Sequence, residues 1–303
     1  MTDVVPLGRR EHGPGGRSGC CDRPRPHRQL EGTDDVRRIR DHHIQARSRL
    51  DDERITVSAL GPSQRKVVLI SGASSGIGEA TARHLAAEGH LIVAGARRGD
   101  RLVSLADEVR AAGGEIDFHL LDVTSRNSMS AFAAAALERH GRVDVLVNNA
   151  GVMALSAVAD LRIDEWEQMI DVNLRGVLFG IAAVLPHMLR QGSGHIVNLS
   201  SVSGHRADPT AAVYSATKFA VTALSEGLRQ ESSDIRVTVI SPGFTHSELT
   251  HQGGSPDAQS QARAAAEALA IPASAIARAI GFAVAQPPEV DVNEIIVRPS
   301  AQH

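Results

Sequence analysis

A tyrosine and a lysine four residues apart form the most reactive pair in this sequence. Tyr214 is the only tyrosine and Lys218 is one of two lysines, and both lie in an alanine-rich stretch of helical length. Side chains at this spacing point to one face of a helix. An ammonium beside a phenol favours the phenolate and lowers its pKa from about 10, which would make Tyr214 a general acid or base near neutral pH. A helical pair without a catalytic role is the alternative.

A glycine-rich turn could hold a phosphorylated cofactor. Residues 71–78 read SGASSGIG and follow the apolar run KVVLIS. Glycines there allow a tight turn and close backbone approach, and the first amides of the next helix would be free to hold a pyrophosphate. Such turns also occur for packing alone. The position between an apolar strand and a helix is what favours the cofactor site.

Seven apolar runs alternate with alanine-rich stretches after residue 65. The runs predict strands at 66–71, 90–96, 115–123, 143–151, 194–201, 235–243 and 292–299. The stretches between them predict helices at 76–88, 100–112, 125–140, 164–191, 211–231 and 272–286. This alternation predicts an α/β fold: one doubly wound, Rossmann-like domain at 63–303, with a seven-stranded, mostly parallel sheet flanked by helices.

Composition narrows the classes of function. A net charge of −3 argues against a protein built to bind nucleic acid or an anionic membrane. Cys20 and Cys21 are adjacent and form no disulfide framework or CxxC motif. No apolar run approaches the roughly 18–20 residues that span a bilayer, and the histidines show no metal-ligand spacing. We expect a cytoplasmic protein with a small-molecule substrate and no metal, nucleic-acid or membrane partner.

The first 62 residues differ from the rest of the chain. Residues 1–60 hold 12 Arg and 10 Asp or Glu, are rich in Gly, Pro and His, and lack aliphatic periodicity. Such a segment cannot bury enough apolar surface to offset its ordering entropy, so residues 1–62 are predicted to be largely disordered.

Over residues 66–298 the sequence resembles the short-chain dehydrogenase/reductase family. The motifs occur in family order: SGASSGIG at 71–78, LDVT at 121–124, NNAG at 148–151, DVN at 171–173, LSSVSG at 199–204, YSATK at 214–218 and SPG at 241–243. The resemblance implies reversible hydride transfer between a nicotinamide cofactor and an alcohol, ketone or aldehyde. The pattern is similar to NADP-dependent hydroxy-acid dehydrogenases and carbonyl reductases, so a 3-hydroxy acid is one candidate substrate.

The same resemblance implies a catalytic set of Asn173, Ser201, Tyr214 and Lys218. Ser201 would hold and polarise the substrate carbonyl; the neighbouring Ser200 is one position off the family spacing, and a turn or cap role is the alternative for this serine pair. Asn173 would interrupt its helix and anchor a water leading to the lysine, or else be a helix-surface amide. Lys218 would also hydrogen-bond the nicotinamide ribose.

The end of the second predicted strand favours NADP over NAD. An NAD site usually has an acid there, whereas this sequence reads Ala-Gly-Ala-Arg97-Arg98 and its first acid is Asp100. A guanidinium matches a 2′-phosphate in charge and geometry, so Arg97 is predicted as the main contact and Arg98 as the second. Solvated surface arginines are the alternative.

The full predicted cofactor-binding set follows from the motifs and the resemblance. Asp122 would contact adenine, and Ser247 would hold the carboxamide in place of the family's usual threonine. The set is Gly72, Ser74, Ser75, Gly76, Ile77, Gly78, Arg97, Arg98, Asp122, Val123, Asn149, Ala150, Gly151, Tyr214, Lys218, Pro242, Gly243, Thr245 and Ser247.

A polar segment at 245–270 is predicted to be a substrate lid above the strand ends. Met153, His205 and Arg206 are expected to face the same cleft, where Arg206 would bind a carboxylate or else face solvent. The apolar helices that carry Asn173 and Tyr214 would form homotetramer or homodimer interfaces, as in the family, or be buried within one subunit. A non-catalytic NADP-binding sensor or scaffold, or a family enzyme with epimerase or dehydratase chemistry, remains an alternative function.

Overall fold

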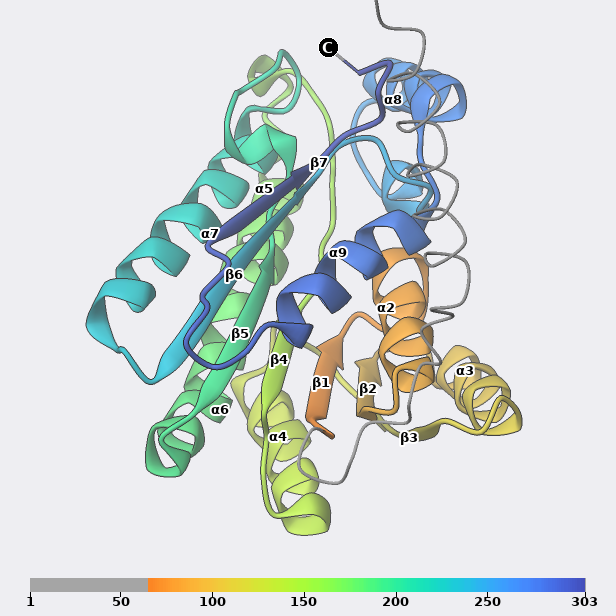
Figure 1. Cartoon of the computed structure of the whole chain (residues 1–303). Coiled ribbons are helices and arrows are strands. Elements are labelled where there is room, and N and C mark those ends of the chain that lie inside the picture. The colour runs from red at the N-terminus through yellow and green to blue at the C-terminus, as the bar shows by residue number, and fades with distance from the viewer. Residues whose placement is uncertain (1–64, 303) are drawn as a thin grey trace, which may run out of the picture. The chain divides into compact units, whose positions relative to one another are not determined.

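A computed structural model describes residues 65–302. Their seven strands form one sheet in the order β3-β2-β1-β4-β5-β6-β7, and every neighbouring pair is parallel (Figure 1). The predicted Rossmann-like fold is therefore confirmed, with a sheet that is wholly parallel. The segment 1–62, predicted to be disordered, lies outside the described residues.

The strands are apolar because helices cover both faces of the sheet. Within β1, Val68 and Ile70 face one core cluster while Val67 and Leu69 face the other. This alternation between two buried faces explains why each strand reads as a continuous apolar run. The strands are β1 (Val67–Ser71), β2 (Leu91–Ala96), β3 (Glu115–Leu120), β4 (Val145–Asn148), β5 (Gly194–Leu199), β6 (Ile235–Pro242) and β7 (Glu294–Val297).

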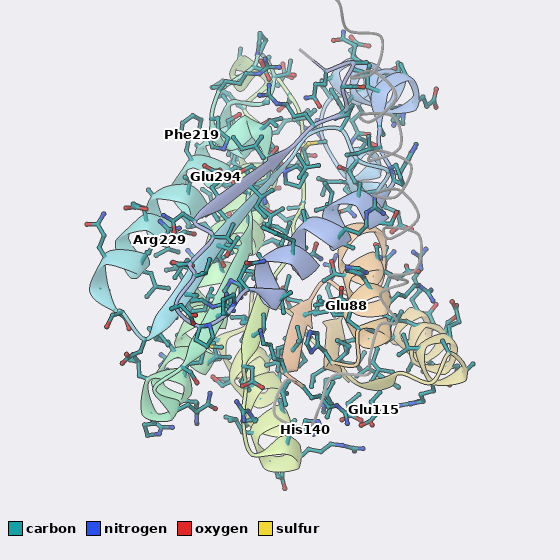
Figure 2. The ribbon with its side chains drawn as sticks, in the orientation of Figure 1. Glu88, Glu115, His140, Phe219, Arg229 and Glu294 are labelled. Carbon is teal, nitrogen blue, oxygen red and sulfur yellow. The ribbon has the colours of Figure 1, made fainter. Side chains whose placement is uncertain are left out.

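The helices divide between the two faces. One face is covered by α2 (Gly76–Ala87), α3 (Gly99–Ala111) and α9 (Ala273–Ala285). The other is covered by α4 (Arg126–His140), α6 (Gly176–Gln191) and α7 (Ala212–Glu231). Arg229 connects α7 to β6 and to the residue before β7, because its Nη2 donates hydrogen bonds to the carbonyls of Val237 (2.9 Å) and Asn293 (3.1 Å) (Figure 2).

Helix α5 (Ile163–Ile170) continues through a π-helical turn at Asp171–Arg175 into α6. By length and composition the run Ile163–Gln191 could cross a membrane, with a mean hydropathy of 1.5 in its most apolar window. Its apolar residues instead pack on the sheet, where Val177, Val184 and Met188 are buried in the same cluster as the strands. We therefore interpret this run as a core helix.

The predicted lid segment contains a helix that the sequence analysis did not anticipate. The structure places a 3₁₀ turn at Glu248–His251 (η4) and helix α8 at Pro256–Leu269 within it. Ser255 caps α8 by accepting from the Ala258 amide at 3.4 Å, and Pro256 occupies the first helical turn. Serine followed by proline is a helix-start signal that was present in the sequence.

The sheet topology determines where a ligand can bind. After β1 the chain builds outward to β2 and β3, then returns to place β4 on the other side of β1. The helices that follow β1 and β4 lie on opposite faces, so a crevice opens at the carboxyl ends of these two strands.

Candidate active site

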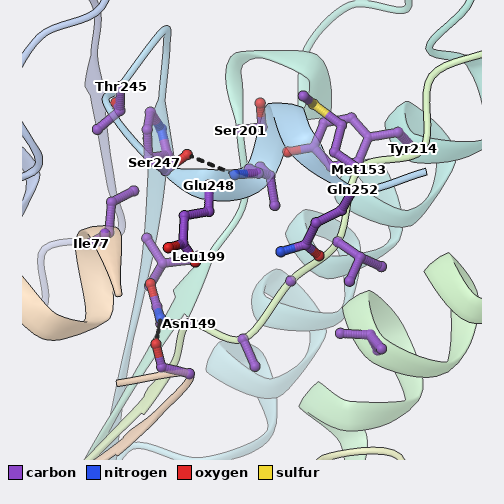
Figure 3. A pocket seen from close by; sticks show the side chains of 18 of the residues that line it. Ile77, Asn149, Met153, Leu199, Ser201, Tyr214, Thr245, Ser247, Glu248 and Gln252 are labelled. Atoms are coloured by element: carbon purple, nitrogen blue, oxygen red, sulfur yellow. Dashed lines mark hydrogen bonds between the residues drawn. The ribbon is translucent and has the colours of Figure 1, made fainter. Parts of the chain in front are cut away.

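A cleft of about 650 Å³ lies at the carboxyl ends of the strands. Every predicted cofactor-binding residue except Gly78 lines it, as do Ser201, Met153 and Arg206. Figure 3 shows Ser201 and Tyr214 close together in this cleft, with Met153 and Gln252 beside the tyrosine and Glu248 projecting from the lid segment. The structure thus gathers into one cavity residues from all seven motifs.

The glycine turn meets the steric requirements of a dinucleotide site. Gly72 and Gly76 have φ values of +69° and +56°, which side chains rarely adopt. A Cβ on Gly78 would lie 2.4 Å from Asn149 Nδ2 and equally close to the Gly72 carbonyl oxygen. Gly78 therefore acts by letting α2 pack against the end of β4. Ser75, the N-cap of α2, makes no side-chain capping bond, so the first amides of α2 remain available to an anion at the cleft.

Ser71 secures this turn to the end of β4. Its Oγ accepts from the amides of Asn149 (3.1 Å) and Ala150 (3.2 Å). The Asn149 amide side chain in turn donates to the carbonyls of Ser71 and Gly72, at 3.0 and 3.1 Å. These bonds hold together the two segments between which the adenosine and pyrophosphate of a dinucleotide would lie.

Tyr214, Ser201 and Lys218 converge on the cleft from two elements. All three are buried, with relative exposures of 5%, 9% and 5%. The Ser201 hydroxyl lies beside the Tyr214 phenol, close enough to act on the pKa of the phenol. Lys218 Nζ lies 5.8 Å from the centre of the tyrosine ring and donates to the Leu199 carbonyl at 2.8 Å. The predicted common helix face of Tyr214 and Lys218 is present.

The predicted effect of Lys218 on the tyrosine is wrong for this structure. Burial raises the pKa of Tyr214 to about 12, and the neighbouring Ser201 hydroxyl opposes that rise only in part. Burial also lowers the pKa of Lys218 to about 8. The lysine directs its ammonium to a backbone carbonyl rather than to the phenol oxygen, so loss of water decides the direction of the tyrosine shift.

The side chains of the two neighbouring serines point in different directions and have different hydrogen-bond partners. Ser200 Oγ points toward α7, where it donates to the Lys218 carbonyl at 3.1 Å and meets Thr222 Oγ1 at 3.3 Å. Ser201 Oγ instead accepts from the Ser203 amide at 3.1 Å and contacts Tyr214. Of the pair, only Ser201 places its hydroxyl beside the phenol.

Asn173 is not a helix-surface amide, because it lies in the π-helical turn with 1% exposure. Its Oδ1 accepts from the Val152 amide and its Nδ2 donates to the Val152 carbonyl, both at 2.9 Å. Nδ2 also donates to Thr217 Oγ1 at 3.2 Å. The interrupted helix thus fixes the segment after β4 against α7, next to the lysine.

The two arginines after β2 have different surroundings. Arg97 is exposed at the cleft. Arg98 donates from Nε and Nη2 to Ser74 Oγ, from Nη2 to Ser75 Oγ and from Nη1 to Glu248. Glu248 was missed by the sequence analysis, since its partner lies 150 positions away in the chain.

Two of the three residues expected to face the substrate line the cleft. Met153 and Arg206 line the cleft as expected, together with the unanticipated Gln168 and Gln252. His205 is not among the lining residues; its Nε2 meets Ser241 Oγ at 3.1 Å and Glu294 Oε1 at 2.8 Å. This expectation was wrong because the loop after β5 turns His205 toward β7.

Comparisons with known proteins agree with this geometry. The sequence model of a family described as short chain dehydrogenase matches residues 66–257. An uncharacterized oxidoreductase of Staphylococcus saprophyticus is 48% identical over 241 residues, covering 78% of this chain and 97% of that protein.

Two solved structures carry nicotinamide cofactors. An alcohol dehydrogenase from the archaeon Thermococcus sibiricus, complexed with 5-hydroxy-NADP, is 34% identical with a TM-score of 0.71, over 79% of this chain and 98% of that one. A short chain dehydrogenase/reductase from Burkholderia phymatum in complex with NAD is 30% identical with a TM-score of 0.71, over 77% and 88%.

Proposed function

Because this chain belongs to the short-chain dehydrogenase family, we propose that it is an NADP(H)-dependent oxidoreductase that interconverts an alcohol and a ketone or aldehyde. The observation that carries the proposal is the buried Tyr214 phenol in the wall of the cleft, with the Ser201 hydroxyl beside it and Lys218 Nζ 5.8 Å from the centre of its ring. A module that only binds a dinucleotide has no need for this arrangement. A 3-hydroxy acid remains a candidate substrate, and 63–303 is the proposed catalytic domain.

Tyr214 and Ser201 have different roles at the substrate oxygen. A bound nicotinamide supplies or accepts the hydride. With a pKa raised to about 12, Tyr214 stays protonated through the neutral range, which is the form needed to donate a proton to the oxygen of a carbonyl undergoing reduction. Ser201 donates a hydrogen bond to the same oxygen and stabilises the charge that develops there.

Lys218 and Asn173 support these two groups. Lys218 lies within 5.8 Å of the tyrosine ring centre and is anchored by the Leu199 carbonyl, so its charge is positioned before any ligand binds. Its pKa of about 8 leaves it mostly protonated at pH 7. Asn173 holds the segment after β4 that forms the wall next to the lysine.

Two arginines support NADP as the cofactor. Arg97 and Arg98 follow β2 at the cleft, where the ribose 2′ position of a dinucleotide would lie, and no acid precedes them there. Arg97→Asp is expected to weaken NADPH binding far more than NADH binding, measured by fluorescence titration of each. Equal weakening of both cofactors would contradict the preference.

The decisive experiment follows NADPH oxidation across keto acids, aldehydes and cyclic ketones, with Tyr214→Phe as the test variant. Phenylalanine keeps the ring but removes the proton donor. We expect cofactor binding to be retained and turnover to fall at least 10²-fold, the low end for loss of a general acid. Retained turnover would contradict the assignment, and cofactor binding without carbonyl reduction would favour a sensor or another chemistry.

Exposed apolar side chains on the outer helices support a homotetramer or homodimer. Ile170 on α5, Leu178 on α6 and Phe219 on α7 are 40%, 42% and 44% exposed (Figure 2 labels Phe219). A contiguous patch of such side chains would mark an interface between subunits. Light scattering after size-exclusion chromatography should give the mass of two or four chains, and a monomer would contradict this proposal.

A further inference from the structure

We propose that Glu248 sets the discrimination between 2′-phosphorylated and unphosphorylated cofactors, because its carboxylate occupies the anion-binding groups of Arg98 and must give them up to a 2′-phosphate. The inference rests on the cofactor cleft of the proposed function. It assigns to Glu248 the role of a competing anion supplied by the chain itself.

Glu248 bridges the two walls of the cleft. It begins the 3₁₀ turn η4 after β6, whereas its partners follow β2 on the opposite side. Its Oε2 lies 2.6 Å from Arg98 Nη1 and its Oε1 lies 2.5 Å from Arg101 Nη1. Each carboxylate oxygen therefore accepts a hydrogen bond from a different guanidinium. Glu248 and Arg98 both line the cleft, so this bridge lies within the volume that a dinucleotide would enter.

The chain's own groups take up most of the donors of Arg98. A guanidinium has five N–H donors. Nε and Nη2 contact Ser74 Oγ at 3.2 and 3.0 Å, Nη2 contacts Ser75 Oγ at 2.8 Å, and Nη1 contacts Glu248. The two serines belong to the glycine turn and hold the guanidinium in place. Among residues 65–302, Glu248 is the only anion that Arg98 contacts, so it is the group that a phosphate would replace.

The competing charge is present in the neutral pH range. Hydrogen bonds from Arg98 and Arg101 lower the pKa of Glu248 to about 2, so the carboxylate is ionised near pH 7. Its side chain is nevertheless 40% exposed, and that of Arg98 is 39% exposed. Exposed ion pairs are weak, so a phosphate dianion can displace the carboxylate. The competition should therefore reduce the affinity for a 2′-phosphorylated cofactor without abolishing its binding.

Two nucleotide fragments isolate this effect from the nicotinamide chemistry. Adenosine 2′,5′-bisphosphate carries the 2′-phosphate and 5′-AMP lacks it. For Glu248→Gln, calorimetry should show about 3- to 10-fold tighter binding of the bisphosphate, a range typical of removing one partly exposed competing charge, with 5′-AMP binding unchanged. Glu226→Gln is the matched control, since Glu226 pairs with Arg229 on α7 and leaves the cleft intact.

Two results would overturn the inference. If both fragments bind more weakly to Glu248→Gln, the carboxylate closes the cleft over any nucleotide instead of competing with one phosphate. If neither fragment changes, the bridge has no part in cofactor choice.

A second variant locates the effect at Arg98. In an Arg98→Gln background the further change Glu248→Gln should alter bisphosphate binding by less than half its effect in the native chain. An undiminished effect would overturn the role of Arg98. Failure of the proposed function gives a different pattern: wild-type protein that prefers NADH, or reduces no carbonyl, leaves the fragment comparison fully interpretable.

Discussion

The neighbouring serines Ser200 and Ser201 provide the sharpest test of the site. Replacing either one by alanine removes a single hydroxyl, and the two variants differ only in which of two adjacent positions loses it. Ser201→Ala removes the donor beside the Tyr214 phenol. Loss of one such donor to a developing oxyanion lowers turnover about 10²- to 10³-fold, or roughly 2.7–4 kcal/mol of transition-state stabilisation. We therefore expect a loss of this size in kcat.

Ser200→Ala should affect stability and leave turnover nearly intact. It removes a bond to the Lys218 carbonyl, but Thr222 Oγ1 also donates to that carbonyl at 3.2 Å, so the acceptor keeps a partner. The free energy of unfolding should fall by about 1 kcal/mol, as for one ordinary hydrogen bond. Ser201→Ala should lose a similar amount, because the Ser203 amide loses its acceptor.

The two variants are compared by NADPH-oxidation rates with the best carbonyl substrate and by urea unfolding. Similar stabilities with widely different turnover would support the assignment. A large loss of turnover in Ser200→Ala, with little in Ser201→Ala, would refute the reasoning from side-chain direction.

Three further predictions concern buried residues. Burial, reinforced by the charge of Lys66, lowers the pKa of His90 to about 4. The unfolded chain therefore takes up a proton on this imidazole at a higher pH than the folded chain does, and the free energy of unfolding should decrease as the pH falls from 6.5 to 4. The loss is at most about 3 kcal/mol, and urea unfolding should show a shallower pH dependence in His90→Gln. Gly78→Ala, whose Cβ would meet Asn149, should lower the free energy of unfolding by about 1–3 kcal/mol and weaken nucleotide binding in calorimetry; unchanged values would show that α2 can shift. Asn173→Ala leaves the buried Val152 amide and carbonyl without this partner and should destabilise by about 1–3 kcal/mol per group in the same unfolding assay, whereas a neutral result would mean that water replaces the amide.

The sequence was most informative where local pattern and tertiary environment agree. Parallel strands buried on both faces must be apolar runs, so the seven strands could be located within a few residues. Helix α8 was missed because it buries only Ala258 and has little apolar periodicity to detect. Its cap and first-turn proline, Ser255 and Pro256, were the available signal.

The spacing of residues along the sequence was enough to determine that Tyr214 and Lys218 share a helix face and that a glycine turn precedes α2. Both are properties of a few consecutive residues. Only the tertiary structure decided that His205 turns away from the cleft and that Glu248 meets Arg98, and it placed the hydroxyl of Ser201, the serine that family spacing favoured, beside the phenol. It also decided the sign of the Tyr214 pKa shift. Approach of distant segments and the exclusion of water depend on how the whole chain packs, and neither is a function of local spacing.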